Sequence, residues 1–194
     1  MRVVVTGMGQ DAAARVARSE VGAGPDAVVV AGVAGGCDPA LAAGTVVLAT
    51  SLCDCAGAPL EAPLARPPVA GATLGTVASC DALVDDAVTR TRLAAAGVLA
   101  VETEAAGWAA ACARTGVPLV VVRAIVDTPE HPLGAAAALV RAGEKGPAAR
   151  RLARLLVRPA AWGTLARLAR QAPRAESRAA TAAVAAAVAL RPGG

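Results

Sequence analysis

The sequence predicts a single α/β domain with a mostly parallel or mixed central sheet flanked by helices, followed by a helical C-terminal segment. Three observations predict this fold. Short β-branched runs alternate with alanine-rich runs from residue 3 to residue 127. The apolar runs are continuous rather than alternating, which is typical of strands that are buried on both faces. At 194 residues and 56% hydrophobic, the chain can bury the core of one domain.

Each predicted element follows from its own run of residues. Apolar, β-branched runs predict six strands, over Val3–Thr6, Asp26–Val33, Gly44–Thr50, Ala72–Ser79, Gly97–Thr103 and Pro118–Asp127. Alanine-rich runs predict helices over Asp11–Ser19, Asp85–Ala96 and Glu104–Thr115. Gly116 and Pro118 end the third helix in the usual way, because glycine follows many helices and proline cannot continue one.

The chain after Pro132 is helical in pattern to its end, with breaks expected near Pro159 and Pro173. We therefore divide the single domain, 1–194, into an α/β core, 1–135, and a C-terminal helical segment, 136–194.

Arginines recur every four residues in that segment, at Arg150, Arg154 and Arg158 and again at Arg170, Arg174 and Arg178. Such rows are typical of a solvated helix face. The alternative is peripheral contact between these basic helices and an anionic membrane surface.

Composition argues against several classes of protein. The net charge is only +4 and aromatic residues make up 1%, so basic residues interleaved with aromatics, as nucleic-acid binding requires, are not found. The start, MRVVVTGMG, has too short an apolar run for a signal peptide, and no apolar stretch reaches about 18 residues. The five cysteines lack the paired spacing of a zinc site and are expected to be buried thiols. A cytoplasmic protein without a metal is expected.

The first glycine-rich turn is Gly7-x-Gly9-x-x-Ala12, which lies between a predicted strand and a helix. This is the position of a dinucleotide fingerprint, but that fingerprint also needs an acid at the end of the second strand. Here the second strand ends in Ala31-Gly32-Val33. A tight turn that opens a helix is the favoured interpretation, and a Rossmann-type NAD-binding oxidoreductase is the alternative.

The second glycine-rich segment, GVAGGCDPALAAGTVVLA, contains Gly32, Gly35 and Gly36 after a buried strand. No helix opens directly after it, so it is not a P-loop. Glycines here would either let backbone amides approach a ligand or form a crowded turn between two strands. The residues alone leave both interpretations open.

Acidic residues end the last two predicted strands, where open α/β sheets bind ligands. Glu102 and Glu104 lie on the same face of an extended segment, and such a carboxylate can accept hydrogen bonds from the two hydroxyls of a ribose diol. Asp127, if partly buried, could remain protonated and act as a general acid. In the alternative interpretation the glutamates merely begin a helix, and Arg123 pairs with one of them.

These segments resemble the nucleoside phosphorylase/nucleosidase superfamily, whose signature reads Val-Glu-Met-Glu-small-Ala and then Val-Val-Arg-Ala-Ile-Ser-Asp. The counterparts here are VETEAA and VVRAIVD, and Asp127 follows Glu104 by 23 residues, as in methylthioadenosine/S-adenosylhomocysteine nucleosidases. GVAGGCDPALAAGTVVLA resembles the family's glycine loop, and VASCDALV resembles its Ser-Gly-Asp-x-Phe-Ile segment. The resemblance covers Val3 to Asp127 and implies a phosphorylase-like fold.

The resemblance implies cleavage of the N-glycosidic bond of a purine nucleoside through an oxocarbenium-like transition state. It implies no cofactor and a homo-oligomer. Asp127 would protonate purine N7, Glu104 would hold the ribosyl hydroxyls, Arg123 would orient the acidic cluster, and Glu102 would support it. The other substrate-binding residues that it implies are Leu83 and Val84, which would line the base pocket, together with Thr103 and with Val33, Ala34 and Gly35 of the glycine loop.

The chain departs from the family pattern at several positions. Thr103 replaces the usual Met, Val126 the usual Ser, Leu83 an aromatic residue that stacks on the base, and Val33 a Ser that helps hold the nucleophile. The family's first strand and water-activating Glu have no counterpart, because the resemblance begins in the second part of that fold. Either the start of the chain is truncated, or the nucleophile is handled differently. The nucleophile is therefore open between water and phosphate as a co-substrate, and a catalytically inactive nucleoside-binding or scaffold subunit is a further alternative.

The short N-terminus and the tail LLVRPAAWGTLARLARQAP resemble hopanoid-associated nucleosidase/phosphorylase proteins. This resemblance implies removal of adenine from adenosylhopane. Trp108 and Trp162 are expected to be packing residues, and His131 a loop residue.

Overall fold

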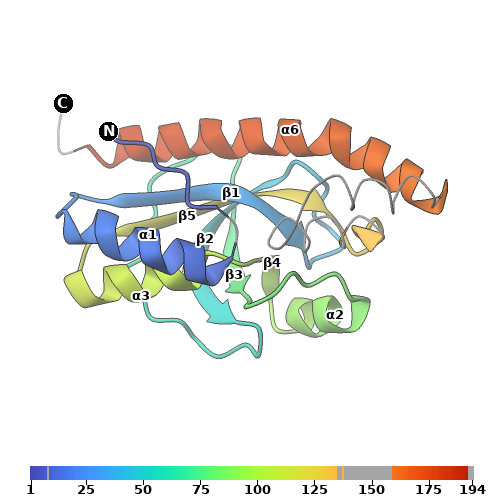
Figure 1. Cartoon of the computed structure of the whole chain (residues 1–194), viewed down its shortest axis with the longest axis horizontal. Coiled ribbons are helices and arrows are strands. Elements are labelled where there is room, and N and C mark those ends of the chain that lie inside the picture. The colour runs from blue at the N-terminus through green and yellow to red at the C-terminus, as the bar shows by residue number, and fades with distance from the viewer. Residues whose placement is uncertain (8, 135–136, 138–158, 192–194) are drawn as a thin grey trace.

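Five strands form the centre of the computed structural model, which describes residues 1–7, 9–134, 137 and 159–191 (Figure 1). The strands are β1 (Val28–Gly36), β2 (Val46–Asp54), β3 (Thr73–Ser79), β4 (Val98–Glu102) and β5 (Leu119–Asp127). They close into a barrel in the order β1-β4-β3-β2-β5. This order confirms a central sheet, although closure into a barrel was not predicted.

The pairing is mixed. β1 with β5, β2 with β3, and β3 with β4 are parallel, whereas β1 with β4 and β2 with β5 are antiparallel. The register of β1 and β5 sets Gly32 beside Arg123 and Gly35 beside Asp127, and Ser79 of β3 lies beside Glu102 of β4. The carboxyl ends of these strands therefore meet at one end of the barrel.

In the part of the chain that the structure describes, the barrel is covered by α1 (Gln10–Gly22), α2 (Ala87–Ala95), α3 (Ala105–Thr115) and α6 (Pro159–Ala189). α1 and α3 pack together on one side, and α6 runs along the other side over β1 and β5 (Figure 1). Gly107 of α3 makes the close approach to α1 possible, because a Cβ there would lie 2.8 Å from the backbone nitrogen of Ala14. Trp108 is buried in the same core, as expected of a packing residue.

β5 is buried along its whole length, as its continuously apolar sequence predicts. Leu119, Val121 and Ile125 join the core with α1 and α3. Val120, Val122, Ala124 and Val126 pack on the α6 side. Because side chains alternate along a strand, Arg123 and Asp127 share the face of Ile125, opposite to α6.

The predicted strand over Val3–Thr6 is wrong. This segment forms no strand, and Val3 and Val5 are 79% and 91% exposed. The run has the apolar, β-branched composition of a strand, but the closed barrel offers no free edge with which it could pair. Composition alone cannot supply the partner strand.

The predicted break at Pro173 is also wrong, since α6 continues through it. Pro173 is exposed, so the helix loses its hydrogen bond on the solvent side, while Ala175 and Ala179 remain buried against the sheet. Trp162, expected to be a packing residue, is 56% exposed. α6 begins at Pro159, and Arg150, Arg154 and Arg158 lie outside the described residues.

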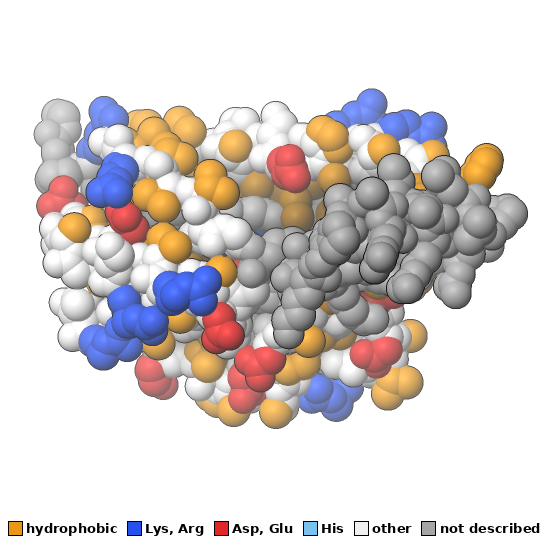
Figure 2. All heavy atoms as spheres, viewed as in Figure 1, with side chains coloured by type: hydrophobic (Ala, Val, Ile, Leu, Met, Phe, Trp, Pro, Cys, Tyr) orange, Lys and Arg blue, Asp and Glu red, His pale blue; other side chains and the backbone are white. Residues whose placement is uncertain are grey.

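Arg170, Arg174 and Arg178 are exposed on α6. Figure 2 shows basic side chains over α6 and a separate basic group near α1 and α3. Within the described residues, no helix combines the length and apolar character needed to cross a membrane.

Candidate functional site

Glu102, the last residue of β4, holds the start of α3. Its carboxylate accepts hydrogen bonds from the backbone nitrogen of Glu104 at 2.9 Å and of Ala105 at 3.0 Å, and its side chain is 1% exposed. Acids at this position are favoured by the positive end of the helix dipole. Ser79 adds a further cap, because its Oγ accepts from the backbone nitrogen of Ala106 at 2.9 Å. Both side chains thus stabilise the start of α3, and no local sequence pattern indicates this role for Ser79.

Arg123 links the two glutamates. Its Nη2 forms a close ion pair with Glu102 and lies 3.4 Å from Oε2 of Glu104. The guanidinium is buried, and Gly32 gives it space, since a Cβ there would lie 2.4 Å from Nη1. The first glycine of the glycine loop therefore leaves room for a buried arginine, which neither interpretation of the sequence had considered.

Glu104 is the more accessible of the two glutamates. Its Oε1 accepts hydrogen bonds from the Thr103 hydroxyl at 2.7 Å and from the backbone nitrogen of Gly9 at 3.3 Å, and its side chain is 16% exposed. Burial opposes ionisation, but Arg123, Thr103 and Gly9 outweigh it and lower the pKa of Glu104. The Gly7-x-Gly9 turn thus places the start of α1 against the carboxylate of Glu104, a group of the protein itself.

The pKa of Glu102 moves in the opposite direction. Burial raises it, and the attraction of Arg123 offsets that rise only in part. Two carboxylates share one arginine here, and the more open one, Glu104, is the one that is more readily ionised. Glu104 therefore has the charge and the access needed to accept hydrogen bonds from a ligand.

Asp127 ends β5 with a side chain that is 2% exposed. Its Oδ2 contacts the Arg90 guanidinium as an ion pair, but receives no well-aligned hydrogen bond from the described residues. Burial raises the pKa of Asp127 to about 6, against the opposing attraction of Arg90. An acid with this pKa can exchange a proton near neutral pH.

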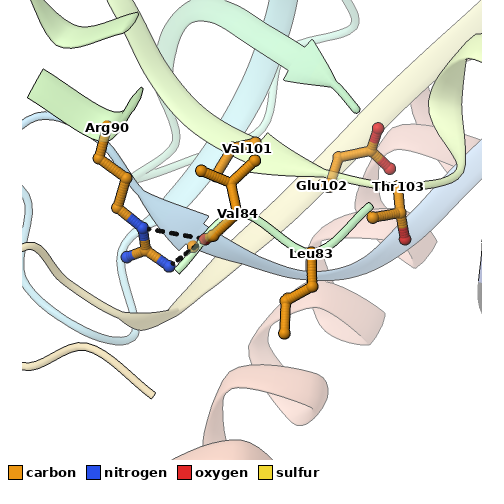
Figure 3. Close-up of a pocket in the computed structure, with 7 residues that line it drawn as sticks. Leu83, Val84, Arg90, Val101, Glu102 and Thr103 are labelled. Carbon is orange, nitrogen blue, oxygen red and sulfur yellow. Dashed lines mark hydrogen bonds between the residues drawn. The ribbon is translucent and has the colours of Figure 1, made fainter. Parts of the chain in front are cut away.

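Leu83 and Val84 line a crevice together with Gly35, Arg90, Val101, Glu102 and Thr103 (Figure 3). Its volume is about 20 Å³, which is room for one water molecule and not for a purine.

A larger cavity of about 450 Å³ is lined in part by Asp127. It is bordered by Thr128, His131 and Arg167 and by residues 39–43. Its size falls in the range of small-molecule sites. His131 is a loop residue, as expected, and it also borders this cavity.

The structure does not bring all of the expected residues together. Val33 packs on the α6 side with Val126, away from the carboxylates. Ala34 lies in the core between the sheet and α1 and α3, whereas Gly35 reaches the crevice. Alternation along β1 puts Val33 and Ala34 on opposite sides, and the register shift between Ala34 and Gly35 interrupts that alternation before Gly35.

The cysteines are free thiols, and Cys37, Cys53, Cys80 and Cys112 are buried, as expected. Burial raises the pKa of Cys37 to about 12, so this thiol is protonated at neutral pH. Among the described residues, no group of three or more His, Cys, Asp or Glu side chains is arranged to hold a metal ion.

Several solved structures share this fold. The 5′-methylthioadenosine/S-adenosylhomocysteine nucleosidase of Neisseria meningitidis, in complex with methylthio-immucillin-A, is 21% identical with a TM-score of 0.63, over 95% of this chain and 78% of that one. The futalosine hydrolase of Helicobacter pylori is 16% identical with a TM-score of 0.62, over 94% and 77%. The H. pylori 5′-methylthioadenosine/S-adenosylhomocysteine nucleosidase is 21% identical with a TM-score of 0.51, over 63% and 64%.

The chain thus spans about two-thirds of the length of the H. pylori nucleosidase. No curated protein matches the chain. The family model described as the phosphorylase superfamily matches residues 1–160, which is most of the sequence. The sheet is a mixed barrel rather than the doubly wound sheet of a Rossmann-type protein, so the structure does not support the NAD-binding alternative. Because the family model matches most of the sequence, the chain belongs to the phosphorylase superfamily.

Proposed function

We propose that this protein cleaves the N-glycosidic bond of a purine nucleoside of the adenosyl class. The observation that carries the proposal is the pair of unlike acids at the carboxyl ends of β4 and β5. Glu104 is accessible and has a lowered pKa, whereas Asp127 is buried and has a pKa raised to about 6. Two acids whose environments separate their pKa values can take different roles in one reaction.

In this mechanism the protonated Asp127 gives its proton to purine N7 as the bond between the base and ribose C1′ breaks. The electron pair of that bond leaves with the base, and positive charge develops on the sugar until an oxygen of water or phosphate adds to C1′; an attacking water gives up its proton to solvent. Glu104 accepts hydrogen bonds from the ribosyl hydroxyls and holds the sugar in place, while Arg123 keeps that carboxylate ionised and oriented. No metal or redox step is required.

The named activities of the similar structures support this substrate class. One is a methylthioadenosine/S-adenosylhomocysteine nucleosidase and another a futalosine hydrolase. For this chain we propose a larger apolar 5′ group, such as that of adenosylhopane. Leu83 in place of an aromatic residue, and exposed Arg170, Arg174 and Trp162 on α6, suit a lipid-like substrate and contact with an anionic membrane surface.

Product analysis tests the proposal. The full-length protein is incubated with adenosine, 5′-methylthioadenosine and adenosylhopane, with and without inorganic phosphate, and adenine and the sugar product are quantified by chromatography. Free ribose products without phosphate indicate hydrolysis, and sugar 1-phosphates formed only with phosphate indicate phosphorolysis. If none of these substrates releases adenine in either condition, the proposed activity is wrong.

A second candidate is a nucleoside-binding subunit that lacks turnover. Val33 favours it, because it stands where the resembling family has a Ser that helps hold the nucleophile, so a nucleoside could bind without being cleaved. Calorimetry with adenosine separates the two functions, since this candidate requires binding without adenine release.

A further inference from the structure

Arg90 is the largest side chain that is fully buried among the described residues, and it belongs to α2. Arginine is rarely buried unless its charge is paired, because removal of the guanidinium from water is costly. α2 is otherwise a short helix, and its Arg92 lies on the surface. A buried arginine on such a helix needs an explanation.

The guanidinium joins three separate segments. Its Nε and Nη2 donate to the carbonyl oxygen of Val84 at 3.2 and 2.9 Å, and Nη1 donates to the carbonyl oxygen of Gly36 at 3.3 Å. Nη2 also pairs with Oδ2 of Asp127. Figure 3 shows Arg90 directed at Val84, which belongs to the loop of residues 80–86. One side chain thus connects that loop, the glycine loop and the end of β5.

The glycine loop leaves room for this arrangement. A Cβ on Gly35 would lie 2.6 Å from Nη2 and 3.0 Å from Cζ of Arg90, so any larger residue would displace the guanidinium. The same strand accommodates Arg123 at Gly32. Gly32 and Gly35 therefore each make space for one buried arginine, and each arginine meets one of the acids in the proposed mechanism.

Among the charged groups around Asp127, Arg90 has the largest effect on its pKa, second only to the effect of burial. Burial raises the pKa of Asp127, and Arg90 of α2 opposes that rise most strongly. Asp85 of the loop before α2 adds a smaller rise, and Arg167 of α6 a smaller decrease. The Cys37 thiol also interacts with both Arg90 and Asp127 but is itself protonated at neutral pH.

We propose that Arg90 is a positioning residue for Asp127: the Arg90 side chain fixes this acid relative to the loop of Leu83 and Val84. Its charge also sets the pH range in which Asp127 holds its proton. This inference rests on the proposed function, in which Asp127 is the proton donor. Arg90 acts through Asp127 and does not itself need to touch the substrate.

The test compares Arg90→Gln and Arg90→Lys with Arg92→Gln, a matched control on the same helix. The Arg92 side chain lies at the surface and donates to the backbone carbonyls of Cys55 and Ala56. The titration of Asp127 is followed by carbon NMR of aspartate-labelled protein, with Asp127→Asn used for assignment. This readout does not depend on turnover. Adenine release is measured in parallel as kcat and KM against pH.

Loss of the charge in Arg90→Gln should raise the midpoint of the Asp127 titration by about one to three pH units, since an opposite charge at this range lowers a carboxyl pKa by that amount. The alkaline limb of kcat should move in the same direction. Arg90→Lys should keep the midpoint close to that of the wild type but lower kcat, because an ammonium cannot hold the carbonyls and the carboxylate in one planar arrangement. Arg92→Gln should change neither quantity.

An unchanged Asp127 midpoint in Arg90→Gln would overturn the inference even if the protein is an active nucleosidase. A shifted midpoint in a protein that releases no adenine would instead reject the proposed function and leave the coupling in place. If Arg90→Gln does not fold, the result for Arg90→Lys decides. A wild-type kcat in Arg90→Lys would overturn the positioning role. If neither variant folds, Arg90 serves stability alone, and the inference is also overturned.

Discussion

The two glutamates at the end of β4 have different partners, although they are only two residues apart. Glu102 accepts from two backbone nitrogens and pairs with Arg123, so its acceptor sites are occupied within the protein. Glu104 accepts from Thr103 and Gly9 and remains partly open. This difference is why we propose that Glu104 accepts hydrogen bonds from the ribosyl hydroxyls, whereas Glu102 stabilises the start of α3.

Glu104→Gln should therefore lower kcat/KM for ribosyl substrates and narrow the preference for ribo- over 2′-deoxyribo-substrates. A hydrogen bond to a charged group contributes roughly 1.5–3 kcal/mol, which corresponds to about one to two decades in kcat/KM. The measurement is adenine release from adenosine and 2′-deoxyadenosine by the wild type and the variant, analysed as a double-mutant cycle between protein and ligand.

Glu102→Gln is the matched control. It breaks a buried ion pair, so the free energy of unfolding should fall by about 3 kcal/mol in urea or thermal denaturation. The folded variant should keep the preference for ribose. If instead Glu102→Gln loses the preference and Glu104→Gln keeps it, the two roles are reversed.

The role of Asp127 as the acid predicts that kcat depends on pH. The acid must be protonated to donate, and its pKa is raised to about 6, so kcat should fall as the pH rises through about 6 and beyond. For a single proton the limiting slope is about tenfold per pH unit. A profile of kcat between pH 5 and 9 checks this, and a rate that increases with pH over that range would remove Asp127 as the acid.

The sequence predicted Asp127, Arg123 and the glutamates because they follow apolar strands in a recognisable order. It could not predict Arg90 or Ser79. Arg90 lies in an ordinary Thr-Arg-Thr-Arg stretch, and its burial depends on contacts with Gly36 and Asp127, which are distant in the chain. A signal was present in retrospect, because Arg90 is three residues before the buried Leu93 and thus on the same face of α2.

At the scale of elements, the contact of α1 with α3 supports the site, because Gly9 at the start of α1 reaches Glu104 at the start of α3. Gly107→Ala should disturb this contact. Its Cβ would lie 2.8 Å from the backbone nitrogen and 3.0 Å from Cα of Ala14, and backbone atoms cannot move aside without moving the helix. We expect a loss of about 1–3 kcal/mol in the free energy of unfolding.

Gly22→Ala in α1 is the control for that substitution, since a Cβ there meets nothing within 4 Å. Alanine inside a helix is favoured over glycine by about 0.5–1 kcal/mol, so Gly22→Ala should leave stability unchanged or raise it. Equal effects of the two substitutions in chemical denaturation would contradict the packing described here.

The predicted helices and strands between Asp11 and Asp127 are confirmed apart from small differences at their ends, because their periodicity and end signals are local. The errors have non-local causes. Val3–Thr6 has the composition of a strand but no partner, and Pro173 is tolerated because α6 is held on the sheet by Ala175 and Ala179. Sequence reports the preference of a segment, whereas the packing of other elements decides the outcome.

At the scale of the whole molecule, the pairing order brings the reacting groups together. The carboxyl ends of β1 and β5 lie together because these strands are parallel, and so do those of β3 and β4. The antiparallel pairing of Gly35 and Gly36 with Val101 and Ala100 joins the two sets. That order joins residues as far apart as Gly9 and Glu104, or Gly36 and Arg90. No local pattern specifies such an order, so the sequence could indicate the sheet but not its closure.

The most direct test of the central claim compares Asp127→Asn with the wild type in adenine release and in adenine binding. Asparagine keeps the shape of the side chain but has no carboxylic proton to give. We predict that kcat falls by about 10²–10⁴, while the Kd for adenine changes by less than about tenfold and circular dichroism shows the same fold. Near-normal turnover in Asp127→Asn would contradict the account, because the bond would then break without the acid on which the mechanism depends.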